Sequence, residues 1–195
     1  PLKALDIEFG VKKVIINSMQ AISGAGYPGV PSLDIVGNVI PFIRGEEEKV
    51  ESESKKILGK LIGGKVIPLN ARISASCNRV PVREGHLESL FVELEKKASV
   101  EGVKKALREF KGIPQELKLH SAPEKPIIFM EEEDRPQPIK DWMKGNGMSC
   151  VVGRVREDKV FDNGIKFSCL ASNTIRGAAG AAILNAELMI AKGLL

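Results

Sequence analysis

One turn signal constrains the fold of this chain more than any other feature. The tripeptide Asp162-Asn163-Gly164 separates two strand-like runs, Met148 to Arg156 and Ile165 to Leu170. Asn-Gly is favoured in tight hairpin turns because both residues tolerate positive φ. The two runs are therefore predicted to pair antiparallel near the end of the chain.

Further strands and helices precede that hairpin. Lys12 to Met19 and His86 to Leu94 have strand patterns, and in the second run alternate residues share one face. Lys65 to Val82 is strand-like in two pieces. Helices are predicted over Glu46 to Leu61, where acidic residues precede lysines and suit the helix dipole, and over Val100 to Phe110.

The remaining segments complete an α+β pattern. Pro123 to Pro138 is rich in proline and is predicted to be a surface excursion around one short strand, Ile127 to Met130. A helix of small residues is predicted after Asn173. Because strands and helices are mixed and the last strands form a hairpin, we expect a mixed β-sheet covered by helices.

Composition narrows the classes of function. A chain of 195 residues can bury the core of one large domain. Its net charge is only +4, with lysines and glutamates interleaved and aromatics at 5%, which argues against nucleic-acid binding. No apolar run approaches the ~20 residues of a membrane helix, so we expect no membrane association and a cytoplasmic location. The cysteines at 77, 150 and 169 lack metal-ligand spacing, so no metal site is expected.

The stretch SCNRVPVREGH, residues 76–86, concentrates reactive side chains. Cys77 and His86 could form a thiol–imidazole dyad, but a cysteine inside a strand is more often a small buried hydrophobe. His86 is either an acid or base or a structural histidine. Arg79 is either a clamp for a carboxylate or phosphate, or one half of a surface salt bridge.

Two other segments carry weaker signals. Glu46 and Lys49 are three residues apart on a predicted helix, so they share one face, which can bind a charged ligand or simply be solvated. The loop SGAGYPG, residues 23–29, would let backbone amides approach a phosphate or a nicotinamide ring. Its spacing differs from the G-x-G-x-x-G dinucleotide fingerprint.

Taken together, five segments resemble the aspartate-semialdehyde dehydrogenase family, above all its archaeal and fungal branch. In chain order they are MQAISGAGYPG at 19–29, GEEEKVESESKKIL at 45–58, SASCNRVPVREGHLESLFVEL at 74–94, GNGMSCVVGR at 145–154 and NTIRGAAGAAILNAELM at 173–189. The resemblance implies the C-terminal catalytic and dimerisation domain of a glyceraldehyde-phosphate-dehydrogenase-like fold. It also implies NADPH-dependent reductive dephosphorylation of aspartyl phosphate through a cysteine thioester.

The same resemblance assigns roles to single residues. His86 corresponds to the acid/base, and Gln20 to a glutamine that orients the substrate. Arg79 corresponds to the arginine that grips the substrate carboxylate. Glu46 and Lys49 correspond to the pair that holds the substrate amino group and the phosphate. The positions near the nicotinamide of NADP are Ser23, Gly24 and Asn173.

The resemblance also divides the chain. Residues 1–11 correspond to the helix that follows the family's nucleophilic cysteine, 12–168 to the catalytic and dimerisation domain, and 172–195 to a helix that packs on the nucleotide-binding domain. The family's nucleotide-binding domain and nucleophile precede Pro1, so the chain alone is predicted to be inactive. A homodimer is expected, with a tetramer also possible.

Two rival functions stay open at the level of sequence. A malonyl-coenzyme A reductase on the same scaffold would keep Arg79 for a carboxylate but would leave Glu46 without an ammonium to bind. A non-enzymatic dimerisation module would bind a partner that supplies the nucleotide domain.

Overall fold

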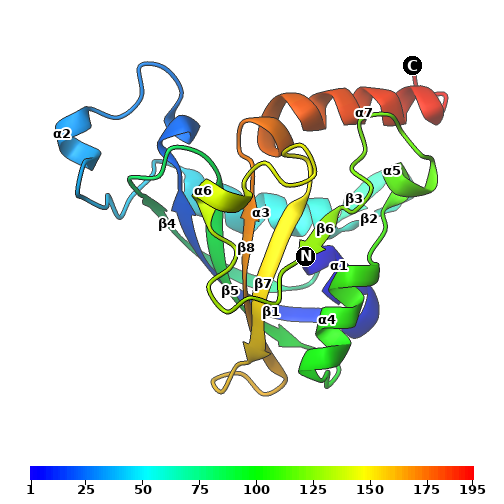
Figure 1. The fold of residues 1–195 in the computed structure, drawn as a ribbon. Helices are drawn as coiled ribbons and strands as arrows, with labels where there is room; N and C mark the ends of the chain where they lie inside the picture. Colours follow the sequence, from blue (N-terminus) through cyan, green and yellow to red (C-terminus); the bar gives the residue numbers. More distant parts are fainter.

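Six strands form one mixed sheet at the centre of the computed structural model, which describes residues 1–195 (Figure 1). The order across the sheet is β4-β1-β5-β8-β7-β6. β1 is parallel to β4 and β6 is parallel to β7, while the other neighbours are antiparallel. The predicted α+β class with a mixed sheet is confirmed. The strands are β1 Val11–Gln20, β4 Arg72–Arg79, β5 His86–Leu94, β6 Ile127–Phe129, β7 Cys150–Glu157 and β8 Gly164–Ala171.

The predicted hairpin is formed by β7 and β8, whose ladder pairs Val151 with Leu170 and Glu157 with Ile165. The predicted tight Asn-Gly turn is wrong, because the connection is the longer loop 158–163, neither Asn163 nor Gly164 has positive φ, and Gly164 already belongs to β8. The excursion before it contributes more than expected, because β6 joins the main sheet as an edge strand and Ile127 is buried in the core.

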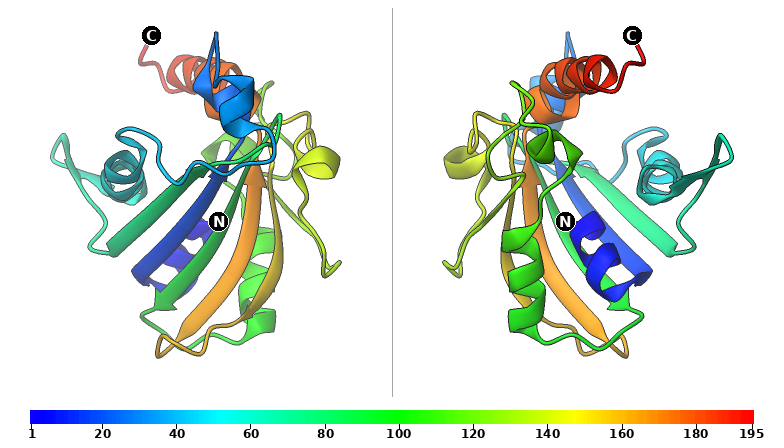
Figure 2. Two further views of the ribbon diagram at one scale, coloured as in Figure 1. Left: turned by 90° about the vertical axis from the view of Figure 1, so that its left-hand side faces the viewer. Right: turned by 90° about the vertical axis from the view of Figure 1, so that its right-hand side faces the viewer.

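Helices cover only one face of this sheet (Figure 2). Helices α1 (Leu2–Phe9) and α4 (Val100–Glu109) lie side by side on that face, and α3 (Glu46–Leu58) flanks the β4 edge. The alternation along β1 and β5 turns apolar side chains toward these helices, where they form one core. Its members include Leu5, Val14, Ile16, Leu90, Val92, Leu94, Val103, Leu107, Ile165 and Phe167.

Helix α3 takes the place of a further strand beside β4. Glu47 and Glu51 are one turn apart, and their carboxylates accept the main-chain N–H groups of Cys77 and Ala75, each at 2.9 Å. Alternate N–H groups of a strand point to the same edge, so the helical spacing of the two acids matches the strand spacing of the two donors. The exposed edge of β4 is thereby closed to another strand.

The end of α3 differs from the prediction. The helix stops at Leu58, and residues 60–67 form an exposed hairpin of β2 (Lys60–Ile62) and β3 (Lys65–Ile67). Gly63 and Gly64 both have positive φ at its turn, the conformation that a two-residue hairpin turn needs. The Gly-Gly pair was the signal for this turn.

The small-residue segment after Asn173 also departs from one continuous helix. A π-helix over Ile175–Ala179 precedes α7 (Gly180–Ala191), and Ala178 has non-helical dihedrals between them. Gly180 packs so closely on Met148 that a Cβ there would lie 2.3 Å from its sulfur. The kink brings Gly180 into this contact, after which α7 runs along the top of the molecule, clear of the sheet (Figure 1).

The remaining elements are short. They are the 3-10 turn Ile22–Ala25, α2 (Ser32–Ile35), α5 (Ile113–Glu116) and α6 (Pro138–Asp141). None of the helices combines the length and hydropathy that a membrane crossing requires.

The packing of α1 generates a stability prediction. Leu5 is fully buried in the core whereas Ile7, on the same helix, is 59% exposed. Replacing Leu5 with alanine should lower the free energy of unfolding by about 2–5 kcal/mol, because it removes buried methyl groups and leaves a cavity. Urea denaturation followed by circular dichroism measures this, with Ile7→Ala as the matched control. Equal losses in both variants would contradict the placement of α1 in the core.

Candidate active site

Three predicted site residues come from strand ends that the sheet brings together. Gln20 ends β1, Arg79 ends β4 and pairs with it, and His86 begins β5 one step beyond the Met19–Leu87 pair. Paired residues on neighbouring strands point to the same face. Their side chains therefore lie on the helix-covered face, at one end of the sheet.

The main chain of Ala21, directly after β1, holds two of these side chains. Its N–H donates to Nδ1 of His86 at 3.1 Å, and its carbonyl accepts from Nη1 of Arg79 at 2.7 Å. Ala21 is completely buried. The main chain of Arg79 is fixed as well, through reciprocal hydrogen bonds with Ile40 at 2.9 and 3.0 Å. Arg79 and His86 are thus oriented by the backbone.

Gly24 lets the chain pass close over this pair. A Cβ at Gly24 would lie 2.8 Å from Cε1 of His86 and 2.9 Å from Nη1 of Arg79. Any larger residue would push one of the two side chains from its place.

Helix α3 brings the charged pair to the same site. Glu46 is its first residue and accepts from Nε2 of Gln20 at 3.1 Å, while Nζ of Lys49 lies 3.5 Å from the other carboxylate oxygen. Burial alone would raise the pKa of Glu46, but the Gln20 hydrogen bond and the Lys49 charge together lower it. Glu46 is therefore a carboxylate, available to a cationic group.

Asn173 connects the C-terminal segment to the glycine loop. Its Nδ2 donates to Oγ of Ser23 at 2.8 Å, and its Oδ1 accepts from the N–H of Gly85 at 3.0 Å. Ser23, Gly24 and Asn173 form one side of the site, beside His86.

All eight residues to which the family resemblance assigns a role line one cavity of about 730 Å³. Two cations, the guanidinium of Arg79 and the ammonium of Lys49, share the cavity with the carboxylate of Glu46. The neutral amide of Gln20 and the imidazole of His86 line it as well. Such a set can bind a small ligand that carries both negative and positive groups. The structure contains no group of three or more His, Cys, Asp or Glu side chains positioned to hold a metal ion.

Burial lowers the pKa of both basic side chains of the site, Arg79 and His86. It lowers the pKa of Arg79, opposed by the charge of Glu46, and the guanidinium nevertheless stays charged. Burial, followed by the positive charge of Arg79, lowers the pKa of His86 to about 4, so the imidazole is neutral at physiological pH.

A second row of side chains beneath the first was missed as part of the site. Ser18, Glu88 and Cys169 are paired across β1, β5 and β8, and Glu88 carries hydrogen bonds from Ser18 at 3.4 Å and from Cys169 at 3.6 Å. Glu88, Cys169 and the neighbouring Cys150 line the cavity. Burial raises the pKa of Glu88. The signal was the two-residue period of the strands, since Ser18 lies two positions from Gln20, Glu88 two from His86, and Cys169 two from Ala171, which pairs with His86.

Cys77 does not belong to the cavity. Its side chain is fully buried, as expected of a strand cysteine, and it is absent from the lining of the site. Burial and the surrounding carboxylates, Glu46 first, raise its pKa to about 11. The Cys77–His86 dyad is therefore excluded.

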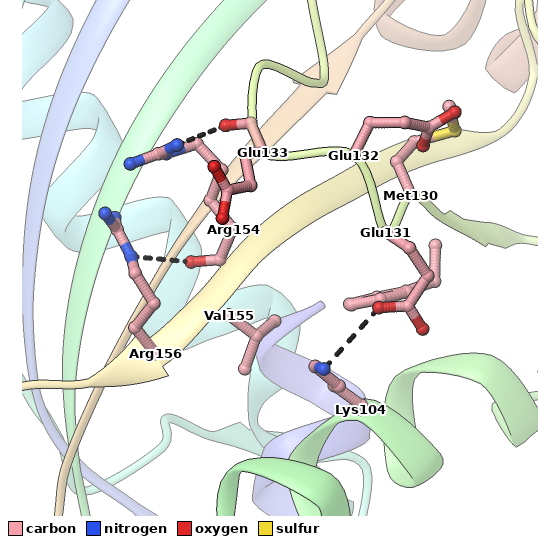
Figure 3. A pocket seen from close by; sticks show the side chains of 9 residues that line it. Lys104, Met130, Glu131, Glu132, Glu133, Arg154, Val155 and Arg156 are labelled. Atoms are coloured by element: carbon pink, nitrogen blue, oxygen red, sulfur yellow. Dashed lines mark hydrogen bonds and ion pairs between the residues drawn. The ribbon is translucent and has the colours of Figure 1, made fainter.

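A smaller cavity of about 310 Å³, between α4 and the ends of β6 and β7, is a poorer candidate (Figure 3). Its cations are already engaged: Lys104 pairs with Glu131 at 3.5 Å, Arg154 donates to the Glu133 carbonyl, and Arg156 donates to the Arg154 carbonyl at 3.0 Å. The cations of its lining thus already donate to groups of the chain itself.

Comparison with known proteins gives one consistent result. A family model described as "Semialdehyde dehydrogenase, dimerisation domain" matches residues 2–176. The aspartate-semialdehyde dehydrogenase of Methanothermobacter thermautotrophicus is 50% identical over 96% of this chain, and that of Archaeoglobus fulgidus is 54% identical over 94%. These matches cover 54% and 52% of the relatives, so the chain spans about half their length.

The same fold occurs in solved structures. The aspartate semialdehyde dehydrogenase of Candida albicans, solved with NADP, superposes with a TM-score of 0.90 at 41% identity, and the alignment covers all of this chain and 55% of that one. Aspartate semialdehyde dehydrogenase II of Vibrio cholerae superposes with a TM-score of 0.77 at 26% identity, over 97% and 57% of the two chains.

The three thiols should differ in reactivity toward a maleimide at about pH 8, because the thiolate is the reacting form. Cys77 is buried with a pKa of about 11, so roughly one molecule in a thousand is thiolate there. The pKa of Cys150 is lowered by its hydrogen bond with Cys169, and Cys150 is partly exposed in the cavity. Mass spectrometry of quenched samples should find Cys150 labelled first and Cys77 last.

Labelling in urea is the control, since all three thiols should then react alike. Rapid labelling of Cys77 in the folded protein would contradict its placement.

Proposed function

Because the chain belongs to the semialdehyde dehydrogenase family, as its dimerisation domain, we propose that it supplies the substrate-binding half of an aspartate-semialdehyde dehydrogenase. The proposed reaction is the NADPH-dependent reduction of aspartyl phosphate to aspartate semialdehyde with release of phosphate. The observation that supports this proposal most strongly is that one cavity is lined by Arg79, Glu46, Lys49 and His86.

The charges of that cavity match the charges of the substrate. Aspartyl phosphate carries a carboxylate, an ammonium and a phosphate, which need a cation, an anion and a second cation at fixed separations. Arg79 binds the carboxylate through its planar guanidinium, Glu46 binds the ammonium, and Lys49, on the exposed side of Glu46, binds the phosphate. Gln20 orients the substrate from between Arg79 and Glu46.

His86 is assigned to the acyl carbon, where protons move as the thioester forms and is reduced. Ser23, Gly24 and Asn173 are assigned to the nicotinamide end of NADP, which supplies hydride when it is bound. The residues fit such a group, because Gly24 has no side chain in the approach to His86 and the Asn173–Ser23 pair offers polar atoms beside it. The NADP complex of the Candida albicans relative supports this choice of cofactor.

The nucleophilic thiolate is proposed to come from outside these 195 residues, as does the nucleotide-binding domain. Cys77 is buried away from the cavity, and hydrogen bonding to Cys150, followed by burial, raises the pKa of Cys169 well above its usual range. Cys150 is the one thiol with a lowered pKa in the cavity, and the family resemblance gives it no role as nucleophile. Pro1 lines the cavity, so a segment joined to it in a longer protein would start at this site. The isolated chain is predicted to lack turnover.

The two outermost elements are proposed to contact the nucleotide-binding domain or a second subunit. Helix α7 exposes Ile183 and Ile190 at 56% and 64%, and it is anchored to the body through Glu187, which accepts two hydrogen bonds from Ser121. The excursion around α2 exposes Leu33 at 93%. Apolar side chains grouped in this way indicate a surface that another unit covers.

The substrate assignment predicts a selective loss in Arg79→Leu. Phosphate-dependent reduction of NADP by aspartate semialdehyde should be measured in the longer protein, expressed with its flanking coding sequence. Loss of a charge-assisted carboxylate contact, about 1.5–3 kcal/mol, should lower kcat/KM by roughly 10- to 150-fold.

Arg72→Leu, at the exposed far end of the same strand, is the matched control and should retain activity. If the unmodified protein shows no turnover with aspartate semialdehyde but reduces malonyl-coenzyme A, the assignment to this family of reductases is supported. The assignment of aspartyl phosphate as the substrate is then wrong. If no acyl donor is reduced, the non-enzymatic dimerisation module becomes the better explanation.

A homodimer that buries the open face of the sheet is also proposed. Phe91 and Ile15 are paired on that face, and no helix packs over them (Figure 2). Ile15 is 46% exposed. The cytoplasmic location and the absence of nucleic-acid partners stay predictions from the sequence.

Phe91→Asp should convert this dimer to monomer while leaving the fold intact, because it places a charge in the centre of an apolar contact. Sedimentation equilibrium at micromolar concentration measures the change. Val160→Asp, at an 83%-exposed position in the loop between β7 and β8, is the control and should stay dimeric. A monomeric unmodified chain would contradict the proposed interface.

A further inference from the structure

Arg176 is the one cationic side chain of the cavity that has no partner within the chain. The cationic side chains of its lining are Arg79, Lys49 and Arg176. Arg79 donates to the carbonyl of Ala21 at 2.7 Å, and Lys49 lies 3.5 Å from a carboxylate oxygen of Glu46. Arg176 is exposed, and its side chain makes neither a hydrogen bond nor an ion pair. Its guanidinium is therefore available to an anion that enters the cavity.

The segment that carries Arg176 is fixed through its main chain. Ser172 is fully buried, its Oγ accepts the N–H of Ile175 at 3.1 Å, and its carbonyl accepts the N–H of Gly177 at 2.8 Å. Arg176 lies between these two donors, within the π-helix Ile175–Ala179, and π-helical turns are frequent at functional sites. Because the backbone is already ordered, binding a ligand costs only the freedom of the Arg176 side chain.

Arg176 and Lys49 serve opposite ends of the cavity. Lys49 belongs to α3, which flanks β4, whereas Arg176 acts on the thiol of Cys150 at the start of β7. The hydrogen bond with Cys169 is the largest cause that lowers the pKa of Cys150, and the charge of Arg176 is a smaller cause in the same direction. The order of the sheet separates β4 from β7 by the strands β1, β5 and β8, a span of roughly 19 Å at the usual strand spacing. The anion that Lys49 is proposed to hold thus leaves Arg176 with room for a second one.

We infer that Arg176 is a further binding residue of the site, which takes a phosphate group at the end of the cavity opposite Lys49. The inference deepens the proposed function and rests on it for the source of the phosphate. Two sources carry this chemistry: the phosphate on the nicotinamide side of NADP, and the phosphate of the substrate. The cofactor is favoured, because Arg176 follows closely on Asn173, which hydrogen-bonds Ser23 among the residues assigned to the nicotinamide.

The charges of the ligands favour a phosphate over a carboxylate at Arg176. Aspartyl phosphate and NADP together carry one carboxylate, and every other anionic group in them is a phosphate. The carboxylate is assigned to Arg79, so a phosphate is the anion left for Arg176. A guanidinium forms two parallel hydrogen bonds with phosphate oxygens, which a lysine ammonium does not.

An ion pair within the chain is the structural alternative for Arg176. Two acidic residues lie in this region, and both have other partners. Glu84 accepts a hydrogen bond from Thr174 at 3.3 Å. Glu88 lines the cavity, but it is hydrogen-bonded by Ser18 and Cys169, and burial raises its pKa, which disfavours a carboxylate there. The structure thus provides no internal anion for Arg176.

NMR titration of the 195-residue chain tests the site without turnover. The probes are inorganic phosphate and nicotinamide mononucleotide, and the main-chain signals of Asn173 and Gly177 report on binding beside Arg176. Arg176→Gln should weaken the binding of at least one probe by about 10-fold, because it removes a charge-assisted hydrogen bond. Arg176→Lys should restore part of the affinity. The matched control is Lys140→Gln, which removes the same charge at an exposed position outside the cavity and should bind both probes like the unmodified chain.

Kinetics of the longer protein identify the source of the phosphate. If Arg176 binds the cofactor, Arg176→Gln should raise KM for NADP by about 10-fold and leave KM for phosphate unchanged. The reverse pattern assigns Arg176 to the phosphate of the substrate. Either pattern supports the inferred site.

Equal affinity of the unmodified chain and Arg176→Gln for both probes would overturn the inference. Absence of probe binding to the unmodified chain, equal losses in Arg176→Gln and Lys140→Gln, or unchanged KM values in an active longer protein would overturn it as well. The binding readout needs no turnover. If the longer protein reduces no acyl donor, the proposed function fails, and the two probes still decide whether Arg176 binds phosphate.

Discussion

The register of β1 between β4 and β5 is the constraint on which the site depends. Gln20 is paired with Arg79 on one side and stands beside His86 on the other, so one strand sets the positions of both flanking groups. A slip of one residue would move every side chain of β1 to the opposite face. It would carry Ile16 and Val14 out of the core together with Gln20 out of the cavity. The burial that stabilises the sheet is thus the same interaction that holds the site in register.

The sequence predicted the strands and the main helices because their patterns are local. Apolar alternation identified β5, the Asn-Gly dipeptide marked where the loop of the β7–β8 hairpin lies although it does not form a tight turn, and acidic and basic ends identified α3. It did not predict where α3 ends, because the Gly-Gly turn that redirects the chain into β2 and β3 competes with a helical pattern of lysines and leucines. The kink at Ala178 was also missed, since it depends on the packing of Gly180 against Met148, which is distant in the sequence.

The site shows the same division between local and long-range information. Motif resemblance identified eight residues, and the structure places them all around one cavity. Neither resemblance nor periodicity could identify the role of Ala21, because an alanine has no functional side chain and its contribution is its main-chain N–H and carbonyl. Glu88 was visible in the alternation with His86, but its proximity to Cys169 required the β5–β8 register.

The position of the site at the end of the strands has a physical reason. Within a sheet each peptide group bonds to a neighbouring strand, so it is not free to bind a side chain. Ala21 comes one residue after the last paired position of β1, where its N–H and its carbonyl both lie beyond the ladder, yet it is fully buried and both groups must find partners. The N–H donates to His86, while the carbonyl accepts from Arg79 and also from the main-chain N–H of Gly24. The cost of leaving a buried N–H unpaired therefore works to keep the imidazole in a fixed orientation, and the site gains a rigid polar group from the same requirement that ends the sheet.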